Sequence, residues 1–558
     1  MPLNESAYGT CSPLIGAGRY NNHDEVEIAM QTGRLNLFDG VCTVGRHLHW
    51  KGGEPHSAQD LLDDMDRVGI SEALVLDTLS RENHPAEGNR RVLEVTSSSP
   101  RLHPAWSALP HGAPGEQAGP GQMVRQMRNH GVGALFLFPV QHGFTLGDWT
   151  VDPFIEPLAG AGVPVFINYN AAGNLQLDQT RWDEVVGMCR RWPSLPVVVT
   201  EWRMRRTNRM VYRALDACPN LRVELSGYWL YHGIEYLVQE WGAHRFIFGS
   251  NWPYLNQECT SATVSMADID DTAKQAIGGG NLRDLLNWSE REHQRPNLPD
   301  PADRFARFAR SGERPEDMTF LDCHGHLGGR SREYHIPHSD LDSTVRDMDR
   351  LGIEQTFVFS FTVVHSDERY GNDLIADAVD HYPGRFVGFA GINPHRDKEE
   401  VLAELDRCER MGLRGIKLIP QYQGASPEGP LIELCCRWAD ERDWIILNHG
   451  WGPPEHLDRL LTAYPDAGFI AGHAALQYGP LARSHDNLWI CSCPVHRPRD
   501  CEKLVEAAGA EKVLFGSDLQ DLPVPWGLGP ILQAELPPAD KQLILRDNMA
   551  GMLERYSV

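Results

Sequence analysis

The chain has 558 residues, of which 41% are hydrophobic and 23% charged, a composition typical of a folded globular protein rather than a disordered or fibrous one. Its 52 Lys and Arg residues against 76 Asp and Glu residues give a net charge of −24, which disfavours nucleic acid and anionic membrane surfaces as partners. No stretch resembles a signal peptide or approaches the roughly 18 apolar residues of a membrane span. We therefore expect a cytoplasmic protein whose partner is a small molecule.

The two halves of the chain repeat one sequence frame. The stretch "DMDRVGI" at 64–70 returns as "DMDRLGI" at 347–353, and the same spacing separates Asp39 from Asp322. Further along, "IFGSNWP" at 247–253 returns as "LFGSDLQ" at 514–520. Self-similarity in the same order along the chain indicates an internal duplication.

The boundary between the two copies is predicted at 289–317. This segment is charged, contains prolines and is poor in residues that favour strands, as is typical of a linker with room for one short helix. We therefore predict a first domain at 1–288, the linker, and a second domain at 318–558. Each domain has roughly the 250 residues that a (β/α)₈ barrel needs.

Short apolar runs alternate with amphipathic stretches along the second half. Apolar residues recur every three or four positions between 341 and 351, which predicts a helix that ends at Gly352. Because strands that alternate with helices favour a parallel sheet with its helices outside, we predict an α/β protein of two tandem (β/α)₈ TIM-type barrels. The strands predicted for the second barrel are 320–326, 355–361, 385–391, 414–419, 444–449, 468–473, 487–492 and 512–517.

Ligand-type residues follow several of these strands. His324 and His326 are two positions apart, so both point to the same side of the first strand, which in a barrel can be the interior. His449, His473 and Asp518 stand at the ends of the fifth, sixth and eighth strands, where barrels carry their chemistry. Since imidazole and carboxylate groups are the ligands of zinc and similar divalent ions, the sequence predicts a metal site.

The 12 cysteines are scattered along the chain, and several stand inside apolar runs. We expect them to be reduced core residues rather than a disulfide framework. The "CSC" stretch at 491–493 has the residue type of a metal site, but packing is the favoured interpretation.

The motifs "DCHGHLG", "GIKLIP", "LNHG", "GH" and "FGSD", spread over 320–518, resemble those of the amidohydrolase superfamily. Within it they are similar to the amidohydrolase-related branch, which includes aminocarboxymuconate semialdehyde decarboxylase and many small-molecule hydrolases. The resemblance implies that His324, His326, His449 and Asp518 bind one divalent ion per chain, with zinc expected. It also implies that His473 assists catalysis without necessarily coordinating the ion.

Lys417 ends the fourth predicted strand. Binuclear members of the superfamily carry a carboxylated lysine there that bridges two ions, so the resemblance leaves a second ion open. The alternatives are an ammonium group that orients the substrate and a salt bridge near the barrel mouth. One ion is favoured, and Lys417 joins Asp518 and His473 as a candidate catalytic residue.

The leading functional hypothesis is a metal-dependent hydrolase of an amide, lactone or related C–N or C–O bond in a small molecule. A bound divalent ion lowers the pKa of water toward about 7, which makes hydroxide available at neutral pH. Asp518 would act as general base and then acid, and His473 would stabilise the developing oxyanion or donate a proton.

Two other functions stay open. The same residues serve non-oxidative decarboxylation of an unsaturated or aromatic acid, and the ligands alone do not separate the two reactions. A binding or scaffold protein without catalysis is the third hypothesis, which the first half alone would suggest. Loop residues that could contact the substrate are Arg330, His335, His338, Tyr422, Trp451, His496 and Arg497.

The first half has lost the ligand set. The positions aligned with His324, His326, His449, His473, Asp518 and Lys417 hold Val41, Thr43, Tyr169, Glu201, Asn251 and Phe136. We predict a barrel without metal chemistry that replaces the second subunit of an ancestral homodimer and shapes the mouth of the catalytic half. The stretch "EWRMRR" at 201–206 is a candidate contributor, and its alternative is a solvated basic surface. Whether the chain also forms a homo-oligomer stays open.

Overall fold

The computed structural model describes residues 35–47, 53–110, 113–170, 179–201, 203–289, 293 and 296–557. The start of the predicted first domain, Trp202 of the "EWRMRR" stretch and part of the predicted linker therefore lie outside the described residues. Between the barrels, helix α13 covers Arg304–Ser311, begins at an Asp303 N-cap and ends at Gly312. Among the helices of the described ranges, none combines the length and apolar content that a membrane span requires.

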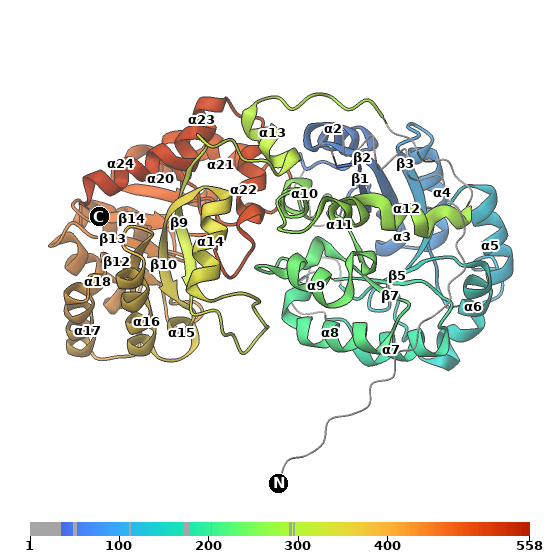
Figure 1. Ribbon diagram of the computed structural model, residues 1–558, viewed down its shortest axis with the longest axis horizontal. Coiled ribbons are helices and arrows are strands. Elements are labelled where there is room, and N and C mark those ends of the chain that lie inside the picture. The colour runs from blue at the N-terminus through green and yellow to red at the C-terminus, as the bar shows by residue number, and fades with distance from the viewer. Residues whose placement is uncertain are drawn as a thin grey trace, which may run out of the picture. The chain divides into compact units, whose positions relative to one another are not determined.

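The first barrel is a parallel sheet in which each strand pairs with the next along the chain (Figure 1). Its strands are β1 (Leu37–Val44), β2 (Ile70–Asp77), β3 (Leu102–Ser107), β4 (Ala134–Leu137), β5 (Val165–Asn168), β6 (Val197–Thr200), β7 (Leu221–Glu224) and β8 (Phe246–Ile247). The main helices around it are α2 (Ala58–Val68), α4 (Pro85–Thr96), α5 (Pro120–Asn129), α6 (Asp148–Ala161), α7 (Trp182–Arg191), α8 (Asn208–Ala217), α9 (Gly233–Trp241), α10 (Gln257–Ser265) and α12 (Asn281–Leu286).

The second barrel repeats this order. Its strands are β9 (Phe320–Leu327), β10 (Ile353–Ser360), β11 (Phe386–Gly391), β12 (Gly415–Leu418), β13 (Ile445–Asn448), β14 (Gly468–Ala471), β15 (Leu488–Cys491) and β16 (Val513–Leu514). Its main helices are α14 (Leu341–Leu351), α16 (Glu368–His381), α17 (Lys398–Arg410), α18 (Pro430–Asp440), α19 (Pro454–Ala463), α20 (Gly479–Ser484), α21 (Asp500–Ala508), α22 (Val524–Leu532) and α24 (Asn548–Arg555).

The prediction of two tandem barrels is confirmed. The strands are buried on both faces, as expected for parallel strands covered by helices. Helix α14 ends at Gly352, which has a φ of 82° and so takes the left-handed conformation that glycine tolerates best. The last strand is shorter than predicted: β16 stops at Leu514, and the residues after it contact β9 through backbone hydrogen bonds, such as the 2.9 Å bond from the Cys323 N–H to the Phe515 carbonyl.

A buried carboxylate closes each barrel. In the first barrel, Asp39 on β1 accepts hydrogen bonds from the backbone N–H of Ser250, at 2.9 Å, and from its hydroxyl. In the second barrel, Asp322 on β9 accepts the same two bonds from Ser517, at 2.9 and 2.5 Å. These contacts join the first strand to the chain after the eighth strand, which explains why "FGS" and the aspartate occur in both halves.

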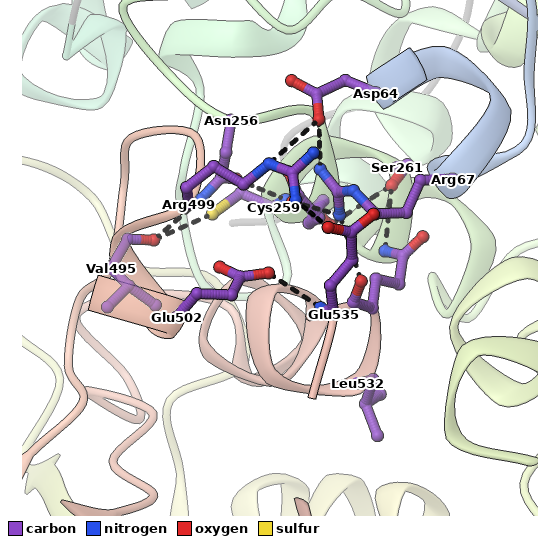
Figure 2. Close-up of polar contacts among 12 residues, drawn as sticks. Asp64, Arg67, Asn256, Cys259, Ser261, Val495, Arg499, Glu502, Leu532 and Glu535 are labelled. Atoms are coloured by element: carbon purple, nitrogen blue, oxygen red, sulfur yellow. Dashed lines mark hydrogen bonds and ion pairs between the residues drawn. The ribbon is translucent and has the colours of Figure 1, made fainter. Parts of the chain in front are cut away.

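Contacts between the two barrels use equivalent positions of the repeat. Arg67 in α2 donates to the carbonyl of Gln533 at 3.0 Å, and Arg350, its counterpart in the "DMDR" motif, donates to the carbonyl of Met266 at 2.5 Å. Helix α10 packs against α22. Figure 2 shows the surrounding polar contacts, including the amide of Asn256, which donates to the Val495 carbonyl at 3.1 Å. The repeated motif therefore supplies contacts between the barrels.

Glu224 gives the first barrel a testable pH dependence. Its fully buried carboxyl accepts bonds from Ser226 and Thr200, and burial raises its pKa to about 7. Between the pKa of an unfolded glutamate and about 7, the folded state holds the extra proton, so this group's contribution to the free energy of unfolding falls as pH rises. The free energy of unfolding of Glu224→Gln, taken relative to that of the wild type, should therefore rise by on the order of 2 kcal/mol between pH 5 and pH 8.

Urea denaturation at both pH values measures this difference. The exposed substitution Glu94→Gln on α4 is the control and should follow the wild type. Parallel pH profiles for Glu224→Gln and the wild type would show that Glu224 does not carry the buried proton.

Candidate metal centre

His324 and His326 project from β9 toward Asp518. The Nε2 atom of His326 lies 2.9 Å from Oδ1 of Asp518, and the Nε2 atom of His324 lies 3.5 Å from the same oxygen. The ligand atoms of the three residues all lie within 4.8 Å of one another. Two imidazole nitrogens and one carboxylate oxygen at this spacing form the donor set of a zinc-type ion, so the residues fit the implied cofactor.

A tight turn places the Asp518 carboxylate. Asp518 has a φ of 61°, and its backbone N–H donates to the carbonyl of His324 at 2.8 Å. The carbonyl of Asp518 in turn accepts the N–H groups of Asp521 and Leu522, each at 2.8 Å. Although burial raises the pKa of Asp518, the imidazoles of His324 and His326 outweigh it and hold the pKa well below its usual range. The group is therefore an anionic ligand.

His449 and His473 lie directly beside this group. They follow β13 and β14, and their ring centroids are 3.9 Å apart, while the rings of His473 and His324 are 5.5 Å apart. Burial lowers the pKa of both imidazoles, to about 3 for His449, so both are neutral and able to donate a lone pair. His449 does not share the mutual 4.8 Å spacing of the other three predicted ligands.

Lys417 on β12 also enters the centre. Its Nζ atom lies 3.2 Å from Nε2 of His324 and 4.4 Å from the centroid of the Phe359 ring. Burial lowers the pKa of Lys417 to about 8. All the side chains predicted for the site therefore line one cavity, and Lys417 faces the same nitrogen that would bind the ion.

The cavity above these residues has a volume of about 250 Å³. Aromatic side chains form much of its wall, and arginines stand at its edge. Two of the arginines, Arg205 and Arg206, come from the first barrel. The aromatic residues are Phe359, Phe361, Tyr334 and Tyr422, and the second barrel contributes Arg330 and Arg332.

The loop residues predicted to contact substrate divide into two sets. Arg330 and Tyr422 line the cavity, but the other five are not among the lining residues of the described structure. Trp451 is a core residue whose indole N–H donates to the Ile470 carbonyl at 3.1 Å. His496 lies against Trp229 and Trp526 between the barrels. Nothing in the sequence marks Phe359 and Phe361 as cavity residues, because they stand in an apolar run without a polar motif.

Cysteines contact the centre without joining the ligand group. The Sγ atom of Cys491 lies 3.7 Å from Nδ1 of His324, on the ring nitrogen opposite the one that faces Asp518. Neither Cys491 nor Cys493 belongs to the candidate ion-binding groups among the described residues. All cysteines of the described ranges are buried and free, as predicted.

The mouth of the first barrel is filled. Val41, Thr43, Phe136, Asn168 and Asn251 line a cavity of about 10 Å³, which is no more than one water molecule needs. Asn251 and Asp518 share the left-handed backbone, with φ values of 56° and 61°. The first barrel therefore keeps the backbone conformation at Asn251, although it has lost the carboxylate that Asp518 supplies in the second barrel.

The counterpart proposed for His449 needs correction. The hydroxyl of Tyr169 donates to Glu184 in α7 at 3.0 Å, so its side chain points out of the first barrel. Asn168, one residue earlier, faces the barrel mouth instead. The residue after a strand can turn to either side, and the sequence pattern alone did not determine which.

A second group of ligand-type residues was not anticipated. Glu72 and His103 lie near the amino ends of β2 and β3, His293 lies in the predicted linker, and Oε1 of Glu72 is 2.7 and 3.1 Å from the two imidazoles. Arg283 binds the other carboxylate oxygen at 2.8 Å. Because the guanidinium already offsets the carboxylate, the charges balance without an ion. We assign this group to the stability of the barrel.

Comparisons with solved structures find chains that each align with less than half of this one. A TIM-barrel protein from Bordetella bronchiseptica has 17% identity over 43% of this chain and 100% of its own, with a TM-score of 0.36. 2,6-Dihydroxybenzoate decarboxylase from Rhizobium has 17% identity over 42% and 99%, with a TM-score of 0.35. A dihydroxybenzoic acid decarboxylase from a Polaromonas species, solved with manganese and an inhibitor, has 18% identity over 42% and 97%, with a TM-score of 0.35.

Comparison with protein-family models gives a match to each barrel. The model described as amidohydrolase matches residues 44–288 and again 321–554. A search among curated proteins found none that matches the sequence. Because the two family matches together cover most of the chain, it belongs to the amidohydrolase family, with the fold of that family present twice.

Proposed function

We propose that the second barrel is a metal-dependent, non-oxidative decarboxylase of a small aromatic or unsaturated carboxylic acid. The observation that carries this proposal is the cavity itself, which combines a His and Asp donor set with aromatic walls and an arginine-rich edge. His324, His326 and Asp518 would hold one divalent ion, with His449 as the neighbouring fourth donor. Zinc is our first choice of ion, since imidazole and carboxylate donors suit it.

The walls of the cavity favour a flat, apolar substrate body. The ring of Phe361 stacks on His326 at 4.5 Å with an interplanar angle of 17°, and Phe359 lies 4.2 Å from the same imidazole. Tyr422 covers His449 from the other side, with ring centroids 4.7 Å apart. An aromatic ring or conjugated chain fits between such faces, because aromatic side chains prefer offset and edge contacts with other π-systems.

The charges at the edge favour an anionic substrate. Arg206, Arg330 and Arg332 line the cavity, and the guanidinium of Arg206 has Glu333 as a carboxylate neighbour at 3.9 Å. Guanidinium groups bind carboxylates through paired hydrogen bonds. A substrate carboxylate is therefore held near the cavity by charge, while the apolar walls disfavour its ionised form and favour loss of neutral CO₂.

The chain's own residues account for the proton balance. Decarboxylation breaks the C–C bond to the carboxyl group, releases CO₂ and needs one proton at the carbon left behind. Asp518 and His473 both face the cavity, and since Asp518 is anionic and His473 neutral, one of them would take this proton from solvent and pass it to the carbon. A bound divalent ion would supply the Lewis acid that withdraws electron density from a substrate oxygen. The Lys417 ammonium group, 3.2 Å from Nε2 of His324, would help to orient that oxygen.

Hydrolysis of an amide or lactone is the second candidate function. It is favoured by the Asp518 carboxylate, which lies beside the proposed ion and could accept a proton from an attacking water. The two functions use the same residues and differ in their products: decarboxylation releases CO₂, whereas hydrolysis adds water to a carbonyl.

The ion assignment can be tested directly. We expect about one divalent ion per purified chain. The affinity for this ion should fall by on the order of a hundredfold in His324→Ala, which removes an imidazole donor, and in Asp518→Asn, which replaces an anionic oxygen by a neutral amide. Elemental analysis of dialysed protein and titration with a chelating dye measure this content and affinity. The matched control is His103→Ala, which changes a buried histidine of the first barrel and should keep the ion. Loss of the ion in His103→Ala alone would place the site at Glu72 instead.

The reaction can be tested with two substrate panels. The metal-loaded protein should release CO₂ from a hydroxylated benzoate or an unsaturated acid, and Asp518→Asn should lower the rate by about 10²–10⁴. Release of ¹³CO₂ from carboxyl-labelled acids is the measurement. If the protein hydrolysed amides or lactones and released no CO₂ from any acid tested, we would conclude that it is a hydrolase and not a decarboxylase.

A further inference from the structure

One arginine of the metal-free barrel contacts the turn that carries Asp518. Arg205 belongs to the short 3₁₀ helix η1 (Met204–Thr207), which follows β6 of the first barrel. Its NH1 atom donates to the carbonyl of Asp521 at 2.6 Å and lies 3.0 Å from the Asp521 carboxylate. Arg205 is 8% exposed, so this pair is largely shielded from water.

Asp521 is part of the same turn as the proposed ligand. Its backbone N–H donates to the Asp518 carbonyl at 2.8 Å, and Leu522 makes an equivalent bond. Asp518 and Gln520 have φ values of 61° and 65°, a conformation that costs a non-glycine residue about 1 kcal/mol or more. A turn with two such residues needs support from its surroundings, and Arg205 contributes one such support.

The same arginine joins the loop above the cavity to this turn. The hydroxyl of Tyr334 binds the Asp521 carboxylate, and the Arg205 guanidinium lies 5.1 Å from the centroid of the Tyr334 ring. Farther along the first barrel, Arg209 donates to the carbonyls of Ser331 and Arg332, at 2.9 and 3.1 Å. Residues 205–209 of the first barrel therefore contact both the turn and the loop 331–334.

The residue equivalent to Asp521 in the first barrel has different partners among the described contacts. Tyr254 stands in the first barrel where Asp521 stands in the second, four residues after the serine that closes the barrel. Its hydroxyl bonds with His47, at 2.6 Å, and with Glu82, at 3.0 Å, both in its own barrel. The duplicated positions have thus diverged, and Asp521 faces an arginine of the other barrel.

We propose that Arg205 is a positioning residue for the proposed ion site, acting through Asp521 on the turn that holds Asp518. The Asp521 carboxylate already offsets the charge of Arg205. Its role therefore differs from that of Arg206 and Arg330, which would bind a substrate carboxylate. The proposal rests on the ion site of the proposed function, but not on which reaction takes place there. It gives the metal-free barrel a defined part in the site of its neighbour.

Ion affinity is the readout that tests this role. In Arg205→Ala the Asp521 carboxylate loses its cation, the turn relaxes, and the affinity for Zn²⁺ should fall about 10- to 100-fold, as when an outer partner of a metal ligand is removed. Arg205→Lys, which keeps the charge but not the paired geometry, should recover part of the affinity. The matched control is Arg213→Ala, which removes an exposed arginine of α8 in the first barrel and should bind Zn²⁺ as tightly as the wild type.

The measurement is competition with a chelating dye on full-length protein, with circular dichroism to confirm that each variant is folded. If Arg205→Ala does not fold, the comparison of Arg205→Lys and Asp521→Asn with Arg213→Ala carries the test, and both Arg205→Lys and Asp521→Asn should weaken binding. Wild-type affinity in folded Arg205→Ala would overturn the positioning role and leave the proposed function standing. A wild-type protein that binds no divalent ion would overturn both.

Discussion

The structure of the site depends on the buried hydrogen bonds between Asp322 and Ser517. They join β9, which carries His324 and His326, to the segment after β16, which carries Asp518. Together with the backbone bond from Asp518 to His324, this closure brings together donors that are almost two hundred residues apart in sequence. Asp322 is fully buried and each of its oxygens accepts a bond from Ser517, so the closure is satisfied internally and needs no ion.

The first barrel has this closure without the metal ligands, so the closing bonds do not depend on the metal site. The first barrel keeps the pair Asp39 and Ser250 and therefore the fold, but its mouth is filled by Phe136 and neighbouring side chains. The "DMDR" motif also persists in both halves, because Arg67 and Arg350 each bind a carbonyl of the opposite barrel. The residues that both halves share are thus those that close each barrel or join the two barrels. The metal ligands occur in the second half only.

Much of this arrangement follows from the sequence, and the failures have physical causes. Strand order and the gathering of His324, His326, His473 and Asp518 follow from period-two alternation and from the shared carboxyl end of a parallel barrel. The direction of Tyr169 does not, because a residue just beyond a strand is oriented by its turn. The contact of Arg205 with Asp521 does not follow from the sequence either, since packing between barrels leaves no periodic pattern in either segment.

The central claim is that one ion binds in the second barrel and none at the equivalent place in the first. Anomalous diffraction from crystals of the metal-loaded protein, recorded on both sides of the zinc absorption edge, tests it most directly. We expect a single strong peak among the side chains of His324, His326 and Asp518, with no peak beside Val41 and Asn251. A peak at the first barrel's mouth, or no peak near Asp518, would contradict it.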